Sequence, residues 1–258
     1  MRKWILPLLI LLPFNVMAET PEEKGMAIAI KADKADTGWQ DMQSEMTMIL
    51  RNRRGDETTR QIRNRQLEVI GDGDKALSIF DSPNDVKGTA FLSHTHSNEA
   101  DDQWLYLPAL KRVKRIASNN KSGPFMGSEF AYEDITSQEV EKYTYKWLRD
   151  ENLDGRETHV IERYPTYQHS GYTKQVAWVD KERLQALKID FYDRKGKLLK
   201  TLTAHDYKQY IGKYWRPAKM EMVNHVTRKS TTLNWNNYKF KNGFGDRDFD
   251  KNTLKRSR

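Results

Sequence analysis

The sequence predicts a mainly β fold of the α+β type, in which a strongly curved antiparallel sheet, or incomplete β-barrel, is partly covered by a few helices. Many short segments alternate apolar and polar residues and are separated by turn residues, as in an antiparallel meander. Aromatic residues make up 11% of a chain that is 37% hydrophobic, so large rings can build its core. Because we find no repeat and no compositional break, residues 19–258 are expected to form one domain.

The N-terminal segment has the pattern of a secretory signal peptide. Arg2 and Lys3 precede the apolar residues 4–14, and the small residues Val16 and Ala18 suit a cleavage site. We therefore expect residues 1–18 to be removed after Ala18. The chain has no cysteine, which excludes a lipid anchor on an N-terminal cysteine, disulfides and thiolate metal sites. Loss of Arg2 and Lys3 lowers the formal net charge from +8 to +6, which still favours anionic surfaces. Export argues against nucleic acid as the partner.

One helix is predicted at residues 21–35, where Met26, Ala27 and Ile30 have helical spacing. The strand predicted at residues 40–50 places Met42, Met46, Met48 and Leu50 on one face. Further strands are predicted at 58–70, 76–80, 89–94, 103–116, 141–148, 159–164, 173–180, 187–192, 198–210, 214–227 and 230–240. Hairpin turns are indicated at 71–74 and 193–197, where glycine supplies a positive φ. Ser128 is expected to cap a short helix that begins at Glu129.

We find no catalytic constellation in the sequence. His94 and His96 have the spacing of metal ligands on a strand, but no third positioned ligand is evident, and a polar loop end with solvated histidines explains them as well. Ser128 lacks the paired glycines of a nucleophile elbow. Phosphate-binding glycine motifs are absent from the sequence. We therefore predict a protein that is not an enzyme and that needs no cofactor or metal, with metal-dependent chemistry at His94 and His96 as the remaining alternative.

Residues 101–135 place large apolar groups beside concentrated positive charge. The run W-L-Y-L at 104–107 leads into Pro108 and then into the basic residues Lys111, Arg112, Lys114 and Arg115. A polar loop and a second aromatic cluster follow. The basic residues suit either a solvated edge strand or contact with a headgroup or acidic partner. This chemistry favours the binding of an amphiphile over bond-making.

The same segment carries a resemblance to a known family. The run D-x-W-L-Y-L-P-A-L-K-R-V-K-R-I, followed by G-P-F-M-G-S-E-F-A-Y-E-D-I, resembles the outer-membrane lipoprotein-sorting protein family, which has a LolA-like domain. Residues 83–92 and 213–217 are similar to the same family, and the likeness covers about residues 25–255. It implies a periplasmic domain in which an incomplete barrel, closed on one side by helices, surrounds a hydrophobic cavity. It also implies association with RND-type (MMPL-like) exporters of the inner membrane.

We therefore predict a periplasmic carrier or acceptor that binds a lipid, a lipoprotein acyl chain or another amphiphile for transfer towards the outer membrane. The candidate cavity residues are Met46, Met48, Phe80, Phe91, Trp104, Tyr106, Phe125, Met126 and Phe130. Headgroup, partner or transient membrane contact is predicted for Lys111, Arg112, Lys114 and Arg115. The alternative is an accessory module that binds an RND-type transporter and fills its inner face with its own side chains. An open cavity would favour the carrier, and a packed interior would favour the module.

Overall fold

The computed structural model describes residues 18–256, so residues 1–17 of the predicted signal peptide lie outside the described residues. Helix α1 (Pro21–Asp36) confirms the prediction for residues 21–35. Thr20 caps this helix, because its Oγ1 accepts a hydrogen bond from the backbone N–H of Glu23 at 3.2 Å. The Thr20 N–H donates in turn to the Glu23 carboxylate at 2.9 Å. This reciprocal capping box, with Pro21 in the first turn, fixes the point where the helix begins.

Within the described residues, thirteen strands form one antiparallel sheet in the order β6-β5-β4-β3-β2-β1-β15-β14-β11-β10-β9-β8-β7. The first half of the chain contributes a meander: β1 (Asp41–Arg51), β2 (Glu57–Leu67), β3 (Lys75–Ser82), β4 (Ala90–His94), β5 (Asp102–Leu107) and β6 (Arg112–Arg115). The second half contributes β7 (Tyr143–Leu153), β8 (Arg156–Pro165), β9 (Tyr172–Asp180), β10 (Ala186–Asp193), β11 (Leu198–His205), β14 (Lys219–Asn224) and β15 (Ser230–Phe240). Strands β12 (Lys208–Tyr210) and β13 (Tyr214–Arg216) form a separate pair.

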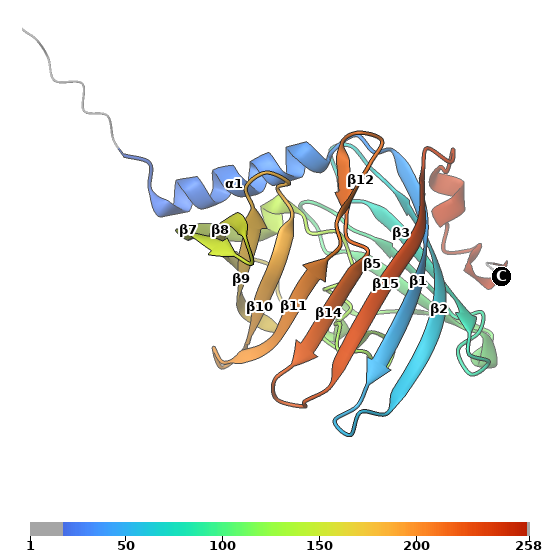
Figure 1. Ribbon diagram of the computed structural model, residues 1–258. Coiled ribbons are helices and arrows are strands. Elements are labelled where there is room, and N and C mark those ends of the chain that lie inside the picture. The colour runs from blue at the N-terminus through green and yellow to red at the C-terminus, as the bar shows by residue number, and fades with distance from the viewer. Residues whose placement is uncertain (1–17, 257–258) are drawn as a thin grey trace, which may run out of the picture.

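The sheet is open and strongly curved (Figure 1), which confirms the predicted fold class. Its edge strands β6 and β7 do not pair with each other, so the barrel is incomplete. Helix α1 lies along β7. At Gly25 the approach is so close that an added Cβ would lie 2.8 Å from the backbone nitrogens of Lys146 and Trp147. The ammonium of Lys24 lies 3.4 Å from the centre of the Trp147 ring. The helix therefore shields one edge of the sheet.

Some predicted strand boundaries were wrong. Residues 103–116 form the β5–β6 hairpin, because the 3₁₀ turn Pro108–Leu110 and Lys111, with a φ of 49°, reverse the chain. Proline lacks the N–H that a continuous strand would donate. Residues 198–210 and 214–227 are likewise each divided into two strands. The predicted hairpins at 71–74 and 193–197 are present, and Gly71 and Gly196 have φ values of 85° and 72°.

The short helix predicted to begin at Glu129 is not formed. Ser128 instead follows the 3₁₀ turn Phe125–Gly127, and its hydroxyl donates to the Phe125 carbonyl at 2.7 Å. The hydroxyl therefore closes the turn before it, and the chain continues as a loop over residues 128–135.

Apolar residues cover both faces of the sheet. The largest cluster lies on the concave face, here called the inner face, and takes side chains from α1, from most strands and from the loop between β6 and β7. A second cluster lies on the outer face of β3 and β4, where Leu77, Ile79 and Leu92 pack against the C-terminal residues Phe249 and Leu254. A third contains Val160, Val176 and Trp178.

Candidate binding site on the inner face of the sheet

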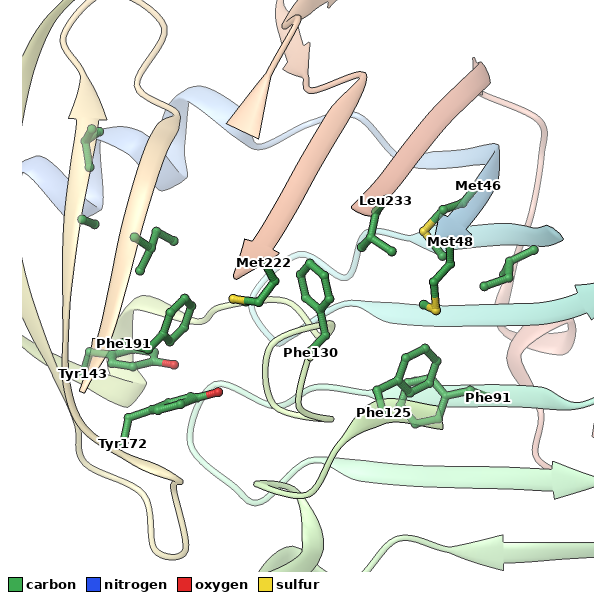
Figure 2. Close-up of a cluster of buried hydrophobic side chains, with 14 of the residues drawn as sticks. Met46, Met48, Phe91, Phe125, Phe130, Tyr143, Tyr172, Phe191, Met222 and Leu233 are labelled. Carbon is green, nitrogen blue, oxygen red and sulfur yellow. The ribbon is translucent and has the colours of Figure 1, made fainter. Parts of the chain in front are cut away.

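The wall of the inner face is built by strand register. Met46 on β1 lies opposite Ile62 on β2, and Ile62 lies opposite Phe80 on β3, so the three side chains follow one another across the same face. Met48 and Phe80 are fully buried, with exposed fractions of 0%. The same wall continues past β1: Leu233 on β15 lies opposite Met48, and Met222 on β14 points into the same space (Figure 2). Methionine suits such a wall because its thioether adapts to irregular shapes.

A loop of residues 123–135, here called the inner strap, lies over this wall. Its Phe125 ring is centred 6.0 Å from that of Phe80 and 5.2 Å from that of Phe91. Phe130 lies between the Met222 side and the Phe125 side of the concavity (Figure 2). Phe125 and Phe130 are 1% and 2% exposed. The inner strap therefore fills the concavity with the chain's own aromatic groups.

A buried ion pair ties the inner strap to the sheet. The Lys200 ammonium on β11 lies 2.6 Å from a carboxylate oxygen of Asp134, and their side chains are 5% and 4% exposed. The same ammonium donates to the Glu129 carbonyl at 2.8 Å. Asp134 also accepts a hydrogen bond from the Tyr172 hydroxyl at 2.8 Å. Since a buried charge is costly without a partner, these contacts hold the strap in one position.

Other anchors of the inner strap are polar contacts along its length. The Glu129 N–H donates to the Thr231 hydroxyl at 3.0 Å, and the Glu129 carboxylate accepts from the Asn224 amide at 2.7 Å. Arg60 donates to the Met126 carbonyl. The buried Glu133 carboxylate accepts three hydrogen bonds, from the hydroxyls of Tyr167 and Ser170 at 2.9 Å and from the Gly171 N–H at 2.8 Å. Burial raises the pKa of Glu133 despite these donors.

Most of the candidate cavity residues lie together. The inner-face cluster contains Met46, Met48, Phe80, Phe91, Phe125 and Phe130, and Met126 packs half-buried against it. Trp104 and Tyr106 lie elsewhere, half-buried in the outer cluster beside Phe249 and Leu254. The alternation along β5 explains this difference, because Leu105 points inward opposite Phe91 and its two neighbours point outward.

The structure adds inner-face residues that sequence reasoning did not select. Those from the first half of the chain are Ile62 and Leu105, and those from the second half include Tyr143, Tyr172, Phe191, Met222 and Leu233. Each lies on a strand in which inward-facing and outward-facing residues alternate. This alternation is the sequence pattern from which they could have been identified. What the sequence lacked was the pairing of β1 with β15, which brings the two halves around one concavity.

The predicted basic contact residues lie at the free β6 edge. Arg112, Lys114 and Arg115 are exposed on that strand, and Arg115 forms an ion pair with Asp102. Lys111 lies in the preceding turn and, with Lys87 and Lys255, lines an outer pocket of about 590 Å³ beside Tyr106. The basic residues thus face solvent and do not enter the inner-face cluster.

A separate polar cavity of about 610 Å³ lies beside the C-terminal end of the inner strap. It is lined by Glu133, Gln138, Glu139, Lys142 and Tyr167, among other residues. Burial raises the pKa of Glu139 to about 7, and the nearby carboxylate of Asp74 contributes to the increase. Burial likewise raises the pKa of Asp74 to about 6.

The two histidines at metal-ligand spacing have other partners. His94 Nε2 is hydrogen-bonded to the Phe249 carbonyl at 2.8 Å, and His96 Nδ1 lies 2.8 Å from the Asp72 carboxylate. Within residues 18–256, no group of three or more potential ligands is arranged to hold a metal ion. Nor does this part of the chain contain a helix long and apolar enough to cross a membrane.

Comparisons with known proteins identify the family. A crystal structure of an outer membrane lipoprotein-sorting protein domain from Vibrio parahaemolyticus is 58% identical to this chain, with a TM-score of 0.89 over 91% of this chain and 99% of the other. A DUF1329 family protein from Desulfovibrio piger is 32% identical, with a TM-score of 0.86 over the same shares.

More distant matches agree in fold. A LolA superfamily protein from Nitrosomonas europaea is 20% identical, with a TM-score of 0.71 over 88% of this chain and 98% of the other. A family model described as "Uncharacterized protein" matches residues 72–256. No curated protein matches. The chain belongs to the family of the outer membrane lipoprotein-sorting protein domain and the DUF1329 proteins, and its fold is LolA-like.

Proposed function

We propose that this protein is a periplasmic carrier or acceptor that holds the acyl part of a lipid, a lipoprotein or another amphiphile against the inner face of its sheet. The observation that carries the proposal is the continuous apolar wall from Met46 to Met222, which is covered by a loop and not by a layer of secondary structure. Membership in a lipoprotein-sorting family supports the same function. No covalent step is required.

Binding at this wall requires the inner strap to move. Exposing Phe125 and Phe130 costs about 3–6 kcal/mol, and separating Lys200 from Asp134 costs about 3–5 kcal/mol more. An acyl chain that buries roughly ten methylenes recovers about 8 kcal/mol. Because these quantities are similar, an amphiphile with one or two acyl chains could exchange reversibly with the strap. A ligand with little apolar surface could not.

The proposed path of the cargo is from the inner membrane towards the outer membrane. Export, with removal of residues 1–18, would place the protein in the periplasm without a lipid anchor. The exposed basic residues Lys111, Arg112, Lys114 and Arg115 would meet a headgroup, a membrane surface or an acidic partner during transfer. No enzymatic activity, metal or cofactor enters this scheme.

A second candidate function is that of an accessory module for an inner-membrane exporter of the RND type. One observation favours it: the inner strap fills the concavity, as expected of a protein whose inner face is packed by its own side chains. In this function the strap would stay closed, and partner binding would use the outer surface. The two functions therefore differ in whether the strap opens.

A cross-link across the inner strap would test this difference. The chain has no cysteine, so the pair Glu129→Cys and Thr231→Cys could be joined by a short bifunctional reagent without side reactions. Lys75→Cys with Asp246→Cys is the matched control, because it joins an ion-paired contact on the outer face. Uptake of a fluorescent fatty acid should be lost in the first variant and kept in the control.

The unsubstituted protein, isolated from its native periplasm, should carry co-purifying lipid that native mass spectrometry can identify. If neither the uncross-linked nor the control protein takes up fatty acid, and native preparations contain no lipid, the carrier function is wrong. Capture of a transporter by cross-linking in cells, with no lipid in the protein, would support the accessory module.

A further inference from the structure

Two neighbouring hairpin turns present exposed aliphatic side chains among exposed cations. The β10–β11 turn and the β14–β15 turn lie side by side at one rim of the sheet (Figure 1), because β11 pairs with β14. The His225 N–H donates to the Leu199 carbonyl at 2.9 Å and fixes their relative position. We call residues 194–198 and 225–229 together the hairpin rim.

The hairpin rim carries two exposed large aliphatic side chains. Val226 is 69% exposed and Leu198 is 40% exposed. The turns that carry them are held by their own hydrogen bonds. The Asn224 side-chain carbonyl accepts from the Val226 N–H at 3.0 Å, and the Asp193 carboxylate accepts from the Lys195 N–H at 2.8 Å. The two aliphatic groups are therefore presented to solvent by ordered turns.

The charge around these aliphatic groups is mostly positive, and the acidic group beside them is Asp193, whose carboxylate interacts with Lys195 and Lys197. Lys195, Lys197, Arg228 and Lys229 are exposed and form no ion pair with any described residue. Both turns are free of acidic residues between 194 and 198 and between 225 and 229. The adjacent β1–β2 turn adds Arg53, which is also exposed and unpaired within residues 18–256.

We propose that the hairpin rim docks on the surface of an anionic lipid bilayer, with Val226 and Leu198 entering the headgroup region. Cations near an anionic bilayer are attracted to it, and isolated aliphatic groups gain by leaving water there. A bilayer needs no shape complement to two protruding turns, whereas a protein partner would have to provide a pocket for each. This surface is distinct from the β6 edge.

This inference deepens the proposed function, since a carrier has to reach a membrane, but bilayer contact can be measured without cargo. The absence of cysteine allows a single environment-sensitive nitrobenzoxadiazole label at Val226→Cys. Ile70→Cys is the matched control, because Ile70 is 74% exposed at the opposite end of β2. The full chain and the chain from Glu19 are both used, so that the apolar residues 4–14 cannot account for binding.

Vesicles of phosphatidylethanolamine and phosphatidylglycerol should shift the emission of the Val226→Cys label to shorter wavelength, and phosphatidylcholine vesicles should not. Lys195→Ala with Lys197→Ala should weaken binding roughly tenfold or more, since each cation contributes about fivefold. High salt should have the same effect. Lys31→Ala with Lys34→Ala on α1 is the charge-matched control and should bind normally.

The inference is overturned if the Val226→Cys label does not respond to the anionic vesicles, or if the Ile70→Cys label responds equally. An acidic protein that shifts the Val226→Cys label when anionic vesicles do not would assign the hairpin rim to a protein partner. Fatty-acid uptake is measured in parallel: a protein that takes up fatty acid but ignores vesicles refutes the docking surface alone.

Discussion

Substitution of Lys200 by methionine should open the inner strap. The change keeps most of the aliphatic stem but removes the ammonium that lies 2.6 Å from Asp134 and 2.8 Å from the Glu129 carbonyl. Asp134 would then be buried at 4% side-chain exposure without its cation. Breaking a buried pair in this way costs about 3–5 kcal/mol. The Lys200 ring contacts with Tyr172 and Phe191, at 5.2 and 5.3 Å, would also be lost.

Two measurements separate global from local effects of Lys200→Met. Urea unfolding followed by circular dichroism reports the free energy of unfolding, which should fall by about 3–5 kcal/mol if the strap unfolds with the sheet. If the strap opens alone, amide exchange should accelerate at Phe125 and Tyr132, whose N–H groups bond to the carbonyls of Phe130 and Gly123. Fatty-acid uptake should rise in either case.

The matched control is Lys219→Met, which removes an exposed pair with Glu221 at 3.9 Å and should cost less than about 1 kcal/mol. The double variant Lys200→Met with Asp134→Leu removes both charges and should recover most of the lost stability. A stability loss at Lys200→Met no larger than that of Lys219→Met, with unchanged exchange in the strap, would refute the reasoning.

Three further predictions concern other parts of the fold. Gly25→Ala should lower the melting temperature, because the added Cβ would lie 2.8 Å from the β7 backbone. This overlap costs about 1–3 kcal/mol, which outweighs the gain of about 1 kcal/mol in helix propensity. A higher melting temperature would contradict the packing of α1. Glu139 has a pKa of about 7 in the folded protein, above the ordinary 4.5, so its protonation stabilises the fold at low pH and this contribution is lost as pH rises from 4.5 to 7. In the natural protein the free energy of unfolding should fall between about pH 5 and about pH 8. In Glu139→Gln this fall, measured by urea unfolding, should be smaller by about 1–3 kcal/mol. An unchanged pH dependence would exclude this assignment. Phe130→Ala and Phe249→Ala should each cost about 3–5 kcal/mol, but only Phe130→Ala, on the inner strap, should alter fatty-acid uptake; equal effects on uptake would contradict the separation of the two faces.

The parts of the fold that the sequence predicts correctly are those fixed by local chemistry. Helix α1 has a capping threonine, a proline in its first turn and helical spacing, all within 16 residues. Hairpins at 71–74 and 193–197 follow from glycines with positive φ. The β5–β6 reversal also had a local signal in Pro108, which weighs against one continuous strand at 103–116.

The site depends on contacts that no local pattern contains. Lys200 and Asp134 are 66 residues apart, so no local pattern in the sequence joins them. The inward direction of Leu105, and with it the outward direction of Trp104 and Tyr106, is set by the register of β5 against β4. Six of the cavity candidates lie in the inner-face cluster, namely Met46, Met48, Phe80, Phe91, Phe125 and Phe130. They were identifiable because they are large and apolar.

The chemistry of the inner strap explains how a filled concavity is compatible with a carrier. Its contacts to the wall are made by apolar rings, which an acyl chain can replace at similar cost. Its anchors at Lys200, Asn224 and Thr231 are polar, and an acyl chain cannot replace them. Affinity for cargo should therefore be limited by the anchors and not by the wall. Loosening an anchor should increase uptake in a carrier, whereas in an accessory module the same change would lower stability and bind nothing.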